Sequence, residues 1–375
     1  MNKAIVIGGD HHNTLGVIRG LGERGVHPDV ILVSKSKMTY VDASKYIANV
    51  WRVKDDNEII DLLLSKYREE DNKPVVICCS DSSSGIIDEN LETLKDYFYL
   101  PGNGQNGRIA SLMNKRRMAA LAEEVGLATP ETLYMNDSCV PLSQIPLPCI
   151  IKPIISRMGK KTEIAVCRTI DELEKYASAH SLANDQIQHY IEKEFEYQLI
   201  GCSTKKGVII PGVSKILRPC KGSNTSFLQY SSINDGFCDI EKCREFVIRT
   251  GYRGLFSMEF LRDRYGKDYF MEINFRNDGN AICVTAAGMS LPYIWYCDCL
   301  NIDYTEELSK SIRTVYVMPD MAELKLLLTK QIRIREYLND LIKTDRFMEY
   351  DKHDMKPFLK LVKYQICSKT NICSD

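Results

Sequence analysis

Two apolar stretches in the second half of the chain carry side chains that could bind a metal ion. Glu259 lies in one stretch, and Glu272 and Asn274 lie in the other. Because side chains alternate along a strand, Glu272 and Asn274 share one face while their apolar neighbours share the other. If the turn-like residues 263–267 join the stretches into an antiparallel hairpin, Glu259 falls opposite this pair. Three hard oxygen donors then converge, which favours Mg²⁺ held with nucleotide phosphates, although a sheet with one solvated face would look the same.

Three basic residues stand in positions that favour an anionic ligand. Arg276 follows Asn274 on the same face and could bind a phosphate through two guanidinium bonds, unless it is a surface arginine at a strand end. Lys152 ends an apolar run, so it either reaches solvent or meets an anion. Lys115 opens a predicted helix, where the helix dipole disfavours a cation. These settings indicate phosphate binding.

A short basic segment could close over phosphates with its backbone N–H groups. It runs over residues 156–161 and includes Ser156, Gly159 and Lys160. The spacing does not match the phosphate loop of the Walker type. A solvated basic turn is the alternative.

The first third of the chain alternates predicted strands and helices. Strands are expected at residues 3–7, 29–33 and 74–79, with helices at 15–24 and 58–69. This order predicts a parallel sheet with crossover connections, whose ligands gather beyond the carboxyl ends of the strands. His11, His12 and residues 81–83 therefore lie beside a candidate substrate site, with a simple polar turn as the alternative for the histidines. The glycines after the first strand lack the dinucleotide-binding spacing.

After residue 112, the regular alternation of strands and helices gives way to short strands and a hairpin, followed by helices. Asn114 is expected to cap a helix over residues 115–125. Short strands follow at residues 149–152, 163–167, 187–191, 197–202 and 207–217, and then the hairpin of residues 254–261 and 268–275. Residues beyond 300 are helical. We therefore expect a mixed α/β and α+β protein with parts at 1–112, 113–300 (a small lid at about 125–192) and 301–375.

Composition narrows the classes of partner. The 375 residues have a formal net charge of -1, which gives no general attraction to nucleic acid or to an anionic membrane. No apolar run approaches the roughly 20 residues of a membrane span. The 14 cysteines are scattered without zinc spacing, as expected of reduced core thiols in a cytoplasmic protein.

Taken together, these features resemble the ATP-grasp superfamily over roughly residues 3 to 300. The features are Asn114 with Lys115 at a helix start, residues 126–130, residues 149–153, residues 188–191, and Glu259 followed by residues 272–276. The chain is most similar to the carboxylate–amine ligases that include D-aspartate ligase, on residues 215–219, 251–255 and 286–293.

The resemblance implies roles for individual residues. Lys115 and Lys152 would contact the α and β phosphates of ATP. Gln188, His189, Tyr190 and Ile191 would line the adenine pocket, and Glu196 or, as an alternative, Glu194 would bind the ribose. Glu259, Glu272 and Asn274 would hold Mg²⁺ (or Mn²⁺), while Arg276 and Arg218 would stabilise the transferred phosphoryl group.

The activity that the resemblance implies is ATP-dependent formation of an amide from a small carboxylate and an amine, with amino acids among the candidates. The carboxylate is activated as an acyl phosphate, and ADP and phosphate are released. A carboxylase-type or purine-pathway-type ATP-grasp enzyme and a non-catalytic ATP-binding regulator are the alternatives. The chain could form a homo-oligomer, and a nucleic-acid partner is not expected.

Overall fold

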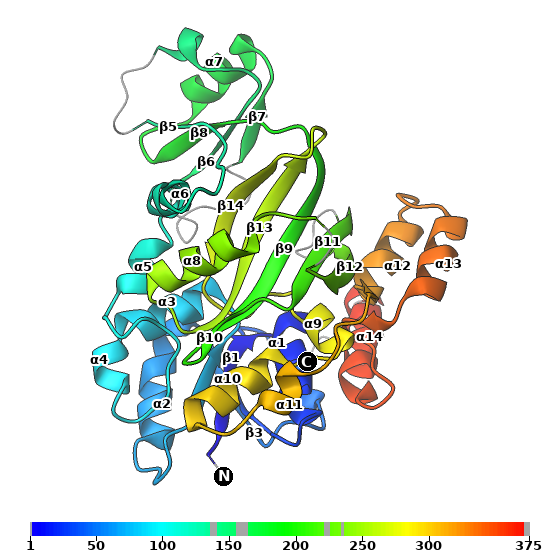
Figure 1. The fold of residues 1–375 in the computed structure, drawn as a ribbon. Coiled ribbons are helices and arrows are strands. Elements are labelled where there is room, and N and C mark those ends of the chain that lie inside the picture. Colours follow the sequence, from blue (N-terminus) through cyan, green and yellow to red (C-terminus); the bar gives the residue numbers. More distant parts are fainter. Residues whose placement is uncertain (1, 136–140, 155–163, 221–225, 234–235, 371–375) are drawn as a thin grey trace.

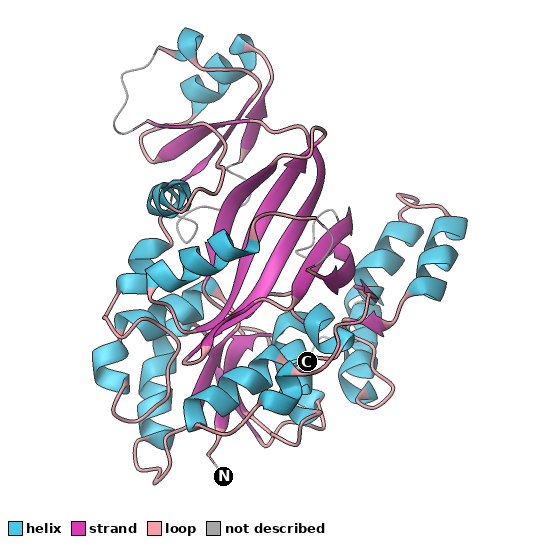
Figure 2. Ribbon diagram, viewed as in Figure 1, coloured by secondary structure: helices cyan, strands magenta, loops and turns pink. Residues whose placement is uncertain are grey.

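The computed structural model describes residues 2–135, 141–154, 164–220, 226–233 and 236–370, with side chains to residue 366. Three sheets are stacked along the long axis of the molecule, with helices packed around them (Figures 1 and 2). In the described part of the chain, no helix is long and apolar enough to cross a membrane.

The first sheet is parallel, with strand order β3-β2-β1-β4. Its strands are β1 (Ala4–Gly9), β2 (Asp29–Val33), β3 (Asn49–Val53) and β4 (Val75–Cys78), and its helices are α1 (His12–Gly22), α2 (Ile59–Tyr67), α3 (Asp81–Glu89) and α4 (Leu91–Leu94). The predicted parallel α/β arrangement is therefore confirmed. β3 was not predicted, because this edge strand is only partly buried and lacks a continuous apolar run.

The second sheet carries the hairpin with the three oxygen-bearing side chains. Its strand order is β14-β13-β9-β11-β12-β15-β16, and β10 pairs with β9. The strands are β9 (Lys193–Thr204), β10 (Gly207–Ile209), β11 (Gly212–Pro219), β12 (Ser226–Ser232), β13 (Gly254–Asp263), β14 (Asp268–Asn274), β15 (Val315–Met318) and β16 (Arg346–Phe347). One predicted strand at 207–217 is in fact two, β10 and β11.

Two apolar cores hold this sheet. On one face, Met258 and Ile273 pack with residues of α8 (Ile240–Thr250) and α6 (Lys115–Glu124). On the other face, Ile200 and Leu255 join the core that contains α1, α9 (Ile282–Ala287) and α10 (Leu291–Leu300). Burial of these faces removes apolar surface from water and fixes the register of the hairpin.

The third sheet is small and lies at the opposite end of the molecule from the first (Figure 1). Its strand order is β5-β8-β6-β7, with β5 (Thr132–Tyr134), β6 (Cys149–Pro153), β7 (Ala165–Cys167), β8 (Asp185–His189) and helix α7 (Ile170–Ala179). α5 (Arg108–Leu112) and α6 connect the first sheet to it. Asn114 caps α6 as predicted, since its side chain accepts hydrogen bonds from Arg116 N and Arg117 N.

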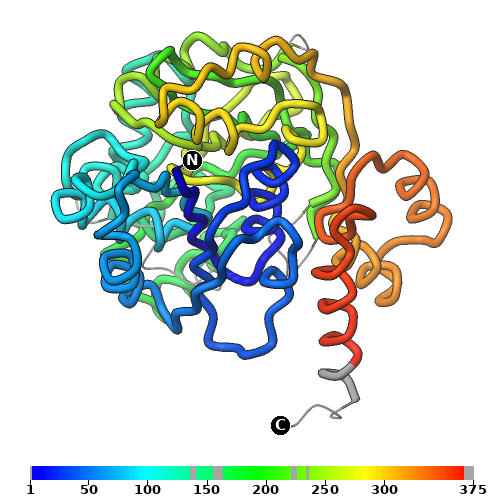
Figure 3. The backbone as a smooth tube through the Cα atoms, turned by 90° about the horizontal axis from the view of Figure 1, so that it is seen from below, coloured from blue at the N-terminus to red at the C-terminus, as the bar shows by residue number. Residues whose placement is uncertain are grey.

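The last part of the chain is mostly helical, as expected, and also adds β15 and β16 to the large sheet. Its helices are α11 (Thr305–Leu308), α12 (Asp320–Leu328), α13 (Ile334–Lys343) and α14 (Met355–Thr370). α14, red in Figure 3, lies at the edge of the molecule beside residues 41–43. The residue boundaries between the three parts of the chain remain a prediction.

Candidate active site

The two glutamates of the hairpin lie directly opposite each other. Glu259 on β13 pairs with Glu272 on β14, and Asn274 lies two residues further along the same face, opposite Ser257. The side-chain Nδ2 of Asn274 donates to Oε1 of Glu259 at 3.1 Å. The structure thus brings the three predicted metal ligands together, and metal binding by them remains a prediction.

The charge balance of this cluster suits a bound cation. Burial, followed by the charges of Glu272 and Asp278, raises the pKa of Glu259 to about 8. Two facing carboxylates repel each other unless a proton or a cation lies between them. Among the described residues, no three His, Cys, Asp or Glu side chains form a metal cluster. An Mg²⁺ ion would therefore complete its oxygen shell with the Asn274 amide, ligand phosphates and water.

Gln198 is a site residue that the sequence analysis missed. It lies on β9 directly opposite Glu259, and its Nε2 donates to Glu259 Oε1 at 3.4 Å. Its Oε1 accepts a hydrogen bond from Asn280 Nδ2 at 2.8 Å. The side chain is buried, so these bonds hold Glu259 in place. The available signal was a polar residue between Tyr197 and Leu199, both buried, in a predicted strand.

The two predicted phosphate-binding lysines face this carboxylate cluster. Lys115 opens α6, and its Nζ is 3.9 Å from Oε2 of Glu272. Lys152 lies on β6, only 9% exposed. Burial and the positive charge of Lys115 lower the pKa of Lys152 to about 8, although Glu272 and Glu259 act in the opposite direction. A buried lysine with a lowered pKa lacks a full counter-charge, which an anionic ligand would supply.

Arg276 connects the hairpin to the first sheet. Its Nε donates to Oδ1 of Asp81 at 2.9 Å, and its Nη1 lies 3.3 Å from Oδ2 of Asp278. Burial would lower the pKa of Arg276, but the two carboxylates raise it well above its usual value. Burial and then the charge of Arg276 lower the pKa of His11. The ends of β1 and β4 and the loop after β14 therefore meet around one guanidinium.

The loop after β14 is held rigidly against the first sheet. Asn277 N donates to the carbonyl of Cys78, and Asn277 Nδ2 donates to Oδ1 of Asn13. Ser257 Oγ donates to Asp278 Oδ2 at 2.9 Å. Among the other substrate candidates, Ser82 and Ser83 lie in the first turn of α3, where the Ser80 side chain caps the helix. The polar residues near Arg276 are thus positioned by hydrogen bonds from both backbone and side-chain groups.

The predicted adenine-binding segment lies at the end of β8. Gln188 is buried, and its Nε2 donates to Thr132 Oγ1 at 2.9 Å, while its Oε1 has no hydrogen-bond partner among the described residues. His189 is exposed, and Tyr190 N donates to the carbonyl of Pro148. Ile191 is buried. Their contact with adenine remains a prediction.

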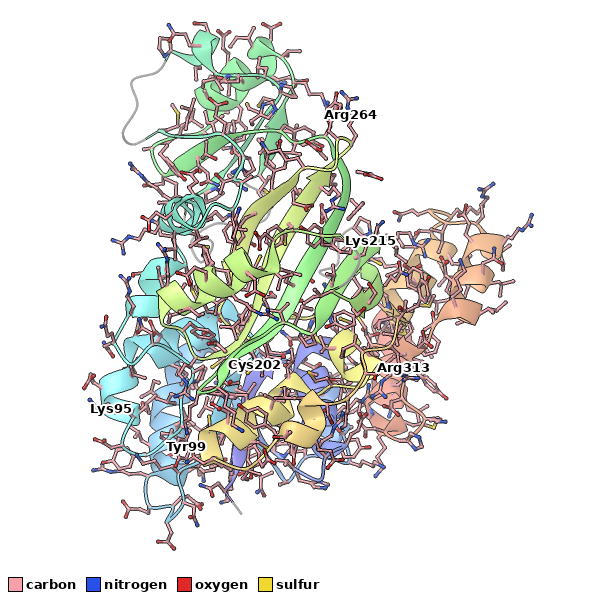
Figure 4. All side chains as sticks on the ribbon, viewed as in Figure 1. Lys95, Tyr99, Cys202, Lys215, Arg264 and Arg313 are labelled. Carbon is pink, nitrogen blue, oxygen red and sulfur yellow. The ribbon has the colours of Figure 1, made fainter. Side chains whose placement is uncertain are left out.

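The two candidates for the ribose lie at the start of β9. Glu196 forms an ion pair with Lys193, and Glu194 is exposed. Nearby, Arg264 marks the turn of the β13–β14 hairpin (Figure 4), and its Nη1 is 3.8 Å from Oε2 of Glu192. The end of the hairpin thus lies beside the segment that joins β8 of the small sheet to β9.

Arg218 has partners in the helices near the end of the chain. It lies on β11, the strand that also carries Lys215, which Figure 4 labels. Its Nη2 contacts Glu323 Oε2 at 2.7 Å and Asp340 Oδ2 at 2.8 Å. These contacts direct the guanidinium toward α12 and α13, and its contact with a phosphoryl group remains a prediction. Ser156, Gly159 and Lys160 lie outside the described residues.

Comparisons with known proteins found similarity in structure. No protein-family model and no curated protein matches the chain. An N5-carboxyaminoimidazole ribonucleotide synthetase, solved with ADP, has a TM-score of 0.62 at 16% identity, covering 84% of this chain and 81% of that one. The L-amino acid ligase of Bacillus licheniformis has a TM-score of 0.63 at 14% identity, covering 84% and 78%.

A third neighbour is the biotin carboxylase domain of the 2-oxoglutarate carboxylase from Hydrogenobacter thermophilus, solved with MgADP, ADP and bicarbonate. It has a TM-score of 0.62 at 17% identity, covering 84% of this chain and 73% of that one. These likenesses extend over most of each chain. The chain therefore has the fold of the ATP-grasp superfamily, as its sequence resemblance predicts.

Proposed function

We propose that this protein is an ATP-dependent carboxylate–amine ligase that activates a small carboxylate as an acyl phosphate and joins it to an amine. One observation carries the proposal: Glu259, Glu272 and Asn274 converge on one face of the hairpin while Lys115 and Lys152 face them from other elements. This arrangement suits a divalent cation on one side and nucleotide phosphates on the other.

The chemistry requires activation because a carboxylate has no good leaving group at neutral pH. Transfer of the γ-phosphoryl group of ATP to a carboxylate oxygen forms a mixed anhydride and releases ADP. The nitrogen of the amine then forms the amide bond, and phosphate leaves. Enzymes support such transfers mainly by positioning the reactants and neutralising charge. Mg²⁺, when bound, would neutralise the phosphate oxygens.

Different residues of this chain would position the reactants and neutralise their charge. Lys115 and Lys152 would bind the phosphate tail, which would supply the negative charge that the buried lysine lacks. Arg276 would bind the carboxylate or the transferred phosphoryl group through its planar guanidinium, whose orientation Asp81 and Asp278 maintain. The segment over residues 156–161 is proposed to cover the nucleotide and exclude water.

The structural neighbours support this class of reaction without identifying the substrates. One of them is an L-amino acid ligase, which agrees with amino acids as candidate substrates. Two others are a carboxyaminoimidazole ribonucleotide synthetase and a biotin carboxylase domain, the latter solved with bicarbonate. Bicarbonate is thus the competing carboxylate for a test to exclude.

The test is a screen for ADP release from MgATP with pooled amino acids, pooled small carboxylic acids and bicarbonate, each with and without added amines. We expect release to need one carboxylate and one amine together. Glu272→Ala should abolish that release while the exposed Glu174→Ala variant retains it. Release with bicarbonate alone would favour a carboxylase, and wild-type turnover by Glu272→Ala would refute the metal assignment.

A further inference from the structure

Helices α12 and α13, together called the helical pair, project from the side of the molecule (Figures 1 and 3). Arg218 of β11 holds both helices, because its Nη2 contacts Oε2 of Glu323 at 2.7 Å and Oδ2 of Asp340 at 2.8 Å. Glu323 belongs to α12 and Asp340 belongs to α13. These contacts determine which face of each helix is turned toward the protein.

The opposite face of α13 carries a row of exposed apolar side chains. Ile334, Leu338 and Ile342 follow one another at intervals of one helical turn and are 64%, 48% and 83% exposed. At about 100° per residue, Leu338 and Ile342 lie about 160° around the helix from Asp340. The row is therefore directed away from β11, into solvent.

The outer face of α12 repeats this arrangement. Leu328 is 66% exposed, and Lys325 is also exposed. They lie about 140° and about 160° around the helix from Glu323. Between the two helices and β11, a small core that contains Leu326 and Ile332 is buried. The outer faces of α12 and α13 therefore form one surface on the solvent side of the helical pair, which we call the outer surface.

Exposed cations accompany the apolar side chains of the outer surface. Lys325 lies on α12, Lys330 lies in the turn between the helices, and Arg335 and Lys343 lie on α13. None of these four side chains forms an ion pair with another described residue. Their charges are thus available to a partner.

The acidic side chains of the same segment have partners within the protein. Residues 320–345 contain equal numbers of acidic and basic residues. Two of the acids bind the guanidinium of β11, and Glu336 pairs with Arg333 at 2.7 Å. Asp320 and Asp345 accept hydrogen bonds from backbone N–H groups outside α12 and α13. The fold thus separates charges that are balanced in the composition and leaves the outer surface positive.

The charge and the size of the outer surface indicate what it binds. Two copies of the chain that met through it would bring like charges together. Helices of 9 and 10 residues side by side cover roughly 15 by 20 Å, or about 300 Å². Each partner in a stable protein–protein interface buries about 800 Å². A bilayer requires neither that area nor a matching shape, since apolar side chains enter the headgroup boundary while lysine and arginine reach the lipid phosphates.

We propose that the outer surface attaches this protein to an anionic membrane. The apolar row of α13 and Leu328 would enter the boundary between headgroups and acyl chains, and the four cations would bind anionic headgroups. The helical pair would lie on the bilayer without crossing it. This proposal does not depend on the proposed ligase function.

The experiment measures co-sedimentation of the full chain with vesicles of pure phosphatidylcholine and of phosphatidylcholine mixed equally with phosphatidylglycerol. We expect binding to the anionic vesicles, little binding to the neutral ones, and release as the salt concentration increases. The double variant Lys330→Gln/Arg335→Gln should lower the affinity for anionic vesicles about 25-fold, since each cation near such a surface contributes about fivefold.

The double variant Leu338→Asn/Ile342→Asn tests the apolar row, and binding should fall on the order of tenfold or more. The matched controls are Lys175→Gln on α7 and Ile248→Asn on α8, both exposed, which should bind as wild type does. Each variant should keep a melting temperature near that of wild type because the altered side chains are exposed, so lost binding is distinguished from lost folding.

Three results would overturn the membrane proposal. They are no binding to either kind of vesicle, equal binding to both kinds, and unchanged binding in both double variants. Polyglutamate serves as a soluble acidic probe. Binding to polyglutamate without binding to anionic vesicles would assign the outer surface to an acidic protein and refute the membrane.

Discussion

Two buried charge clusters in this protein differ in how completely their charges are matched. Arg19, fully buried, uses its Nε and both Nη atoms in hydrogen bonds to Asp354 and to backbone carbonyls. Asp354 also accepts bonds from Ser44 Oγ and Lys45 N. By contrast, Glu259 and Lys152 have pKa values displaced to about 8, in opposite directions. The first cluster is complete without a ligand, and the second is not.

The difference separates a structural role from a functional one. A matched cluster stabilises the fold and joins α1 to the last part of the chain. An unmatched cluster weakens the empty protein and strengthens the binding of whatever supplies the missing charges. Substitutions in the two clusters should therefore have opposite effects on stability and on activity.

The largest effect on stability is expected for Asp354→Ala. This change leaves the Arg19 guanidinium buried without its counter-charge, which typically costs about 3–5 kcal/mol of the free energy of unfolding. Urea denaturation measures it. The control is Glu241→Ala, which removes an exposed partner of Arg244 and should change the midpoint very little. Similar midpoints for the two variants would show that the Arg19 cluster does not hold the fold together.

The hairpin should respond in the opposite way, with Glu259→Gln as the sharpest variant. ADP release should fall on the order of 10²–10³-fold because a preorganised charged group is lost. The variant should also gain stability relative to the wild-type protein as the pH increases. The pKa of Glu259 is raised on folding, so the wild-type protein loses stability as pH increases from the ordinary pKa toward about 8.

Thermal unfolding at pH 5 and pH 9 tests that sign. Glu259→Gln should match the wild-type melting temperature at pH 5 and exceed it at pH 9. A variant that is less stable than wild type at pH 9 would show that the glutamates are already matched in the absence of a ligand.

Much of the site could be predicted from the sequence because its signals are local. The alternation around Glu272 and Asn274 and the turn at 263–267 predict the hairpin, and the register agrees. Contacts over long sequence distances could not be predicted. Gln198 meets Glu259, which lies 61 residues later, and Arg218 meets Glu323 105 residues later. No local pattern marks such pairs, since they depend on how the sheets and helices pack.

Gln198 allows a test of one of these long-range contacts. Gln198→Met keeps the approximate volume but removes the hydrogen bond to Glu259, so Glu259 should lose its fixed orientation. Residues that position metal ligands typically contribute about 10- to 100-fold in affinity. We expect the Kd of MgADP to rise by that factor, as measured by calorimetry. Gln229→Met on β12 is the control, and equal affinities for both variants would remove Gln198 from the site.

The smallest expected effect is the uptake of a fraction of one proton by Lys152 when ADP binds. Its pKa of about 8 means that, at pH 8.5, roughly three-quarters of the free protein carries a neutral amine at this position. Phosphates of bound ADP would raise this pKa, so binding should take up protons at pH 8.5 but not at pH 6.5, where the amine is already charged. Calorimetry of metal-free ADP in two buffers of different ionisation enthalpy measures the proton uptake.

Three variants test whether Lys152 takes up the proton. Glu259→Gln should retain the uptake and Lys152→Met should lose it, whereas the exposed Lys54→Met should match wild type. Uptake that survives in Lys152→Met would mean that the lysine does not meet the phosphates and that the hairpin alone is the unmatched cluster.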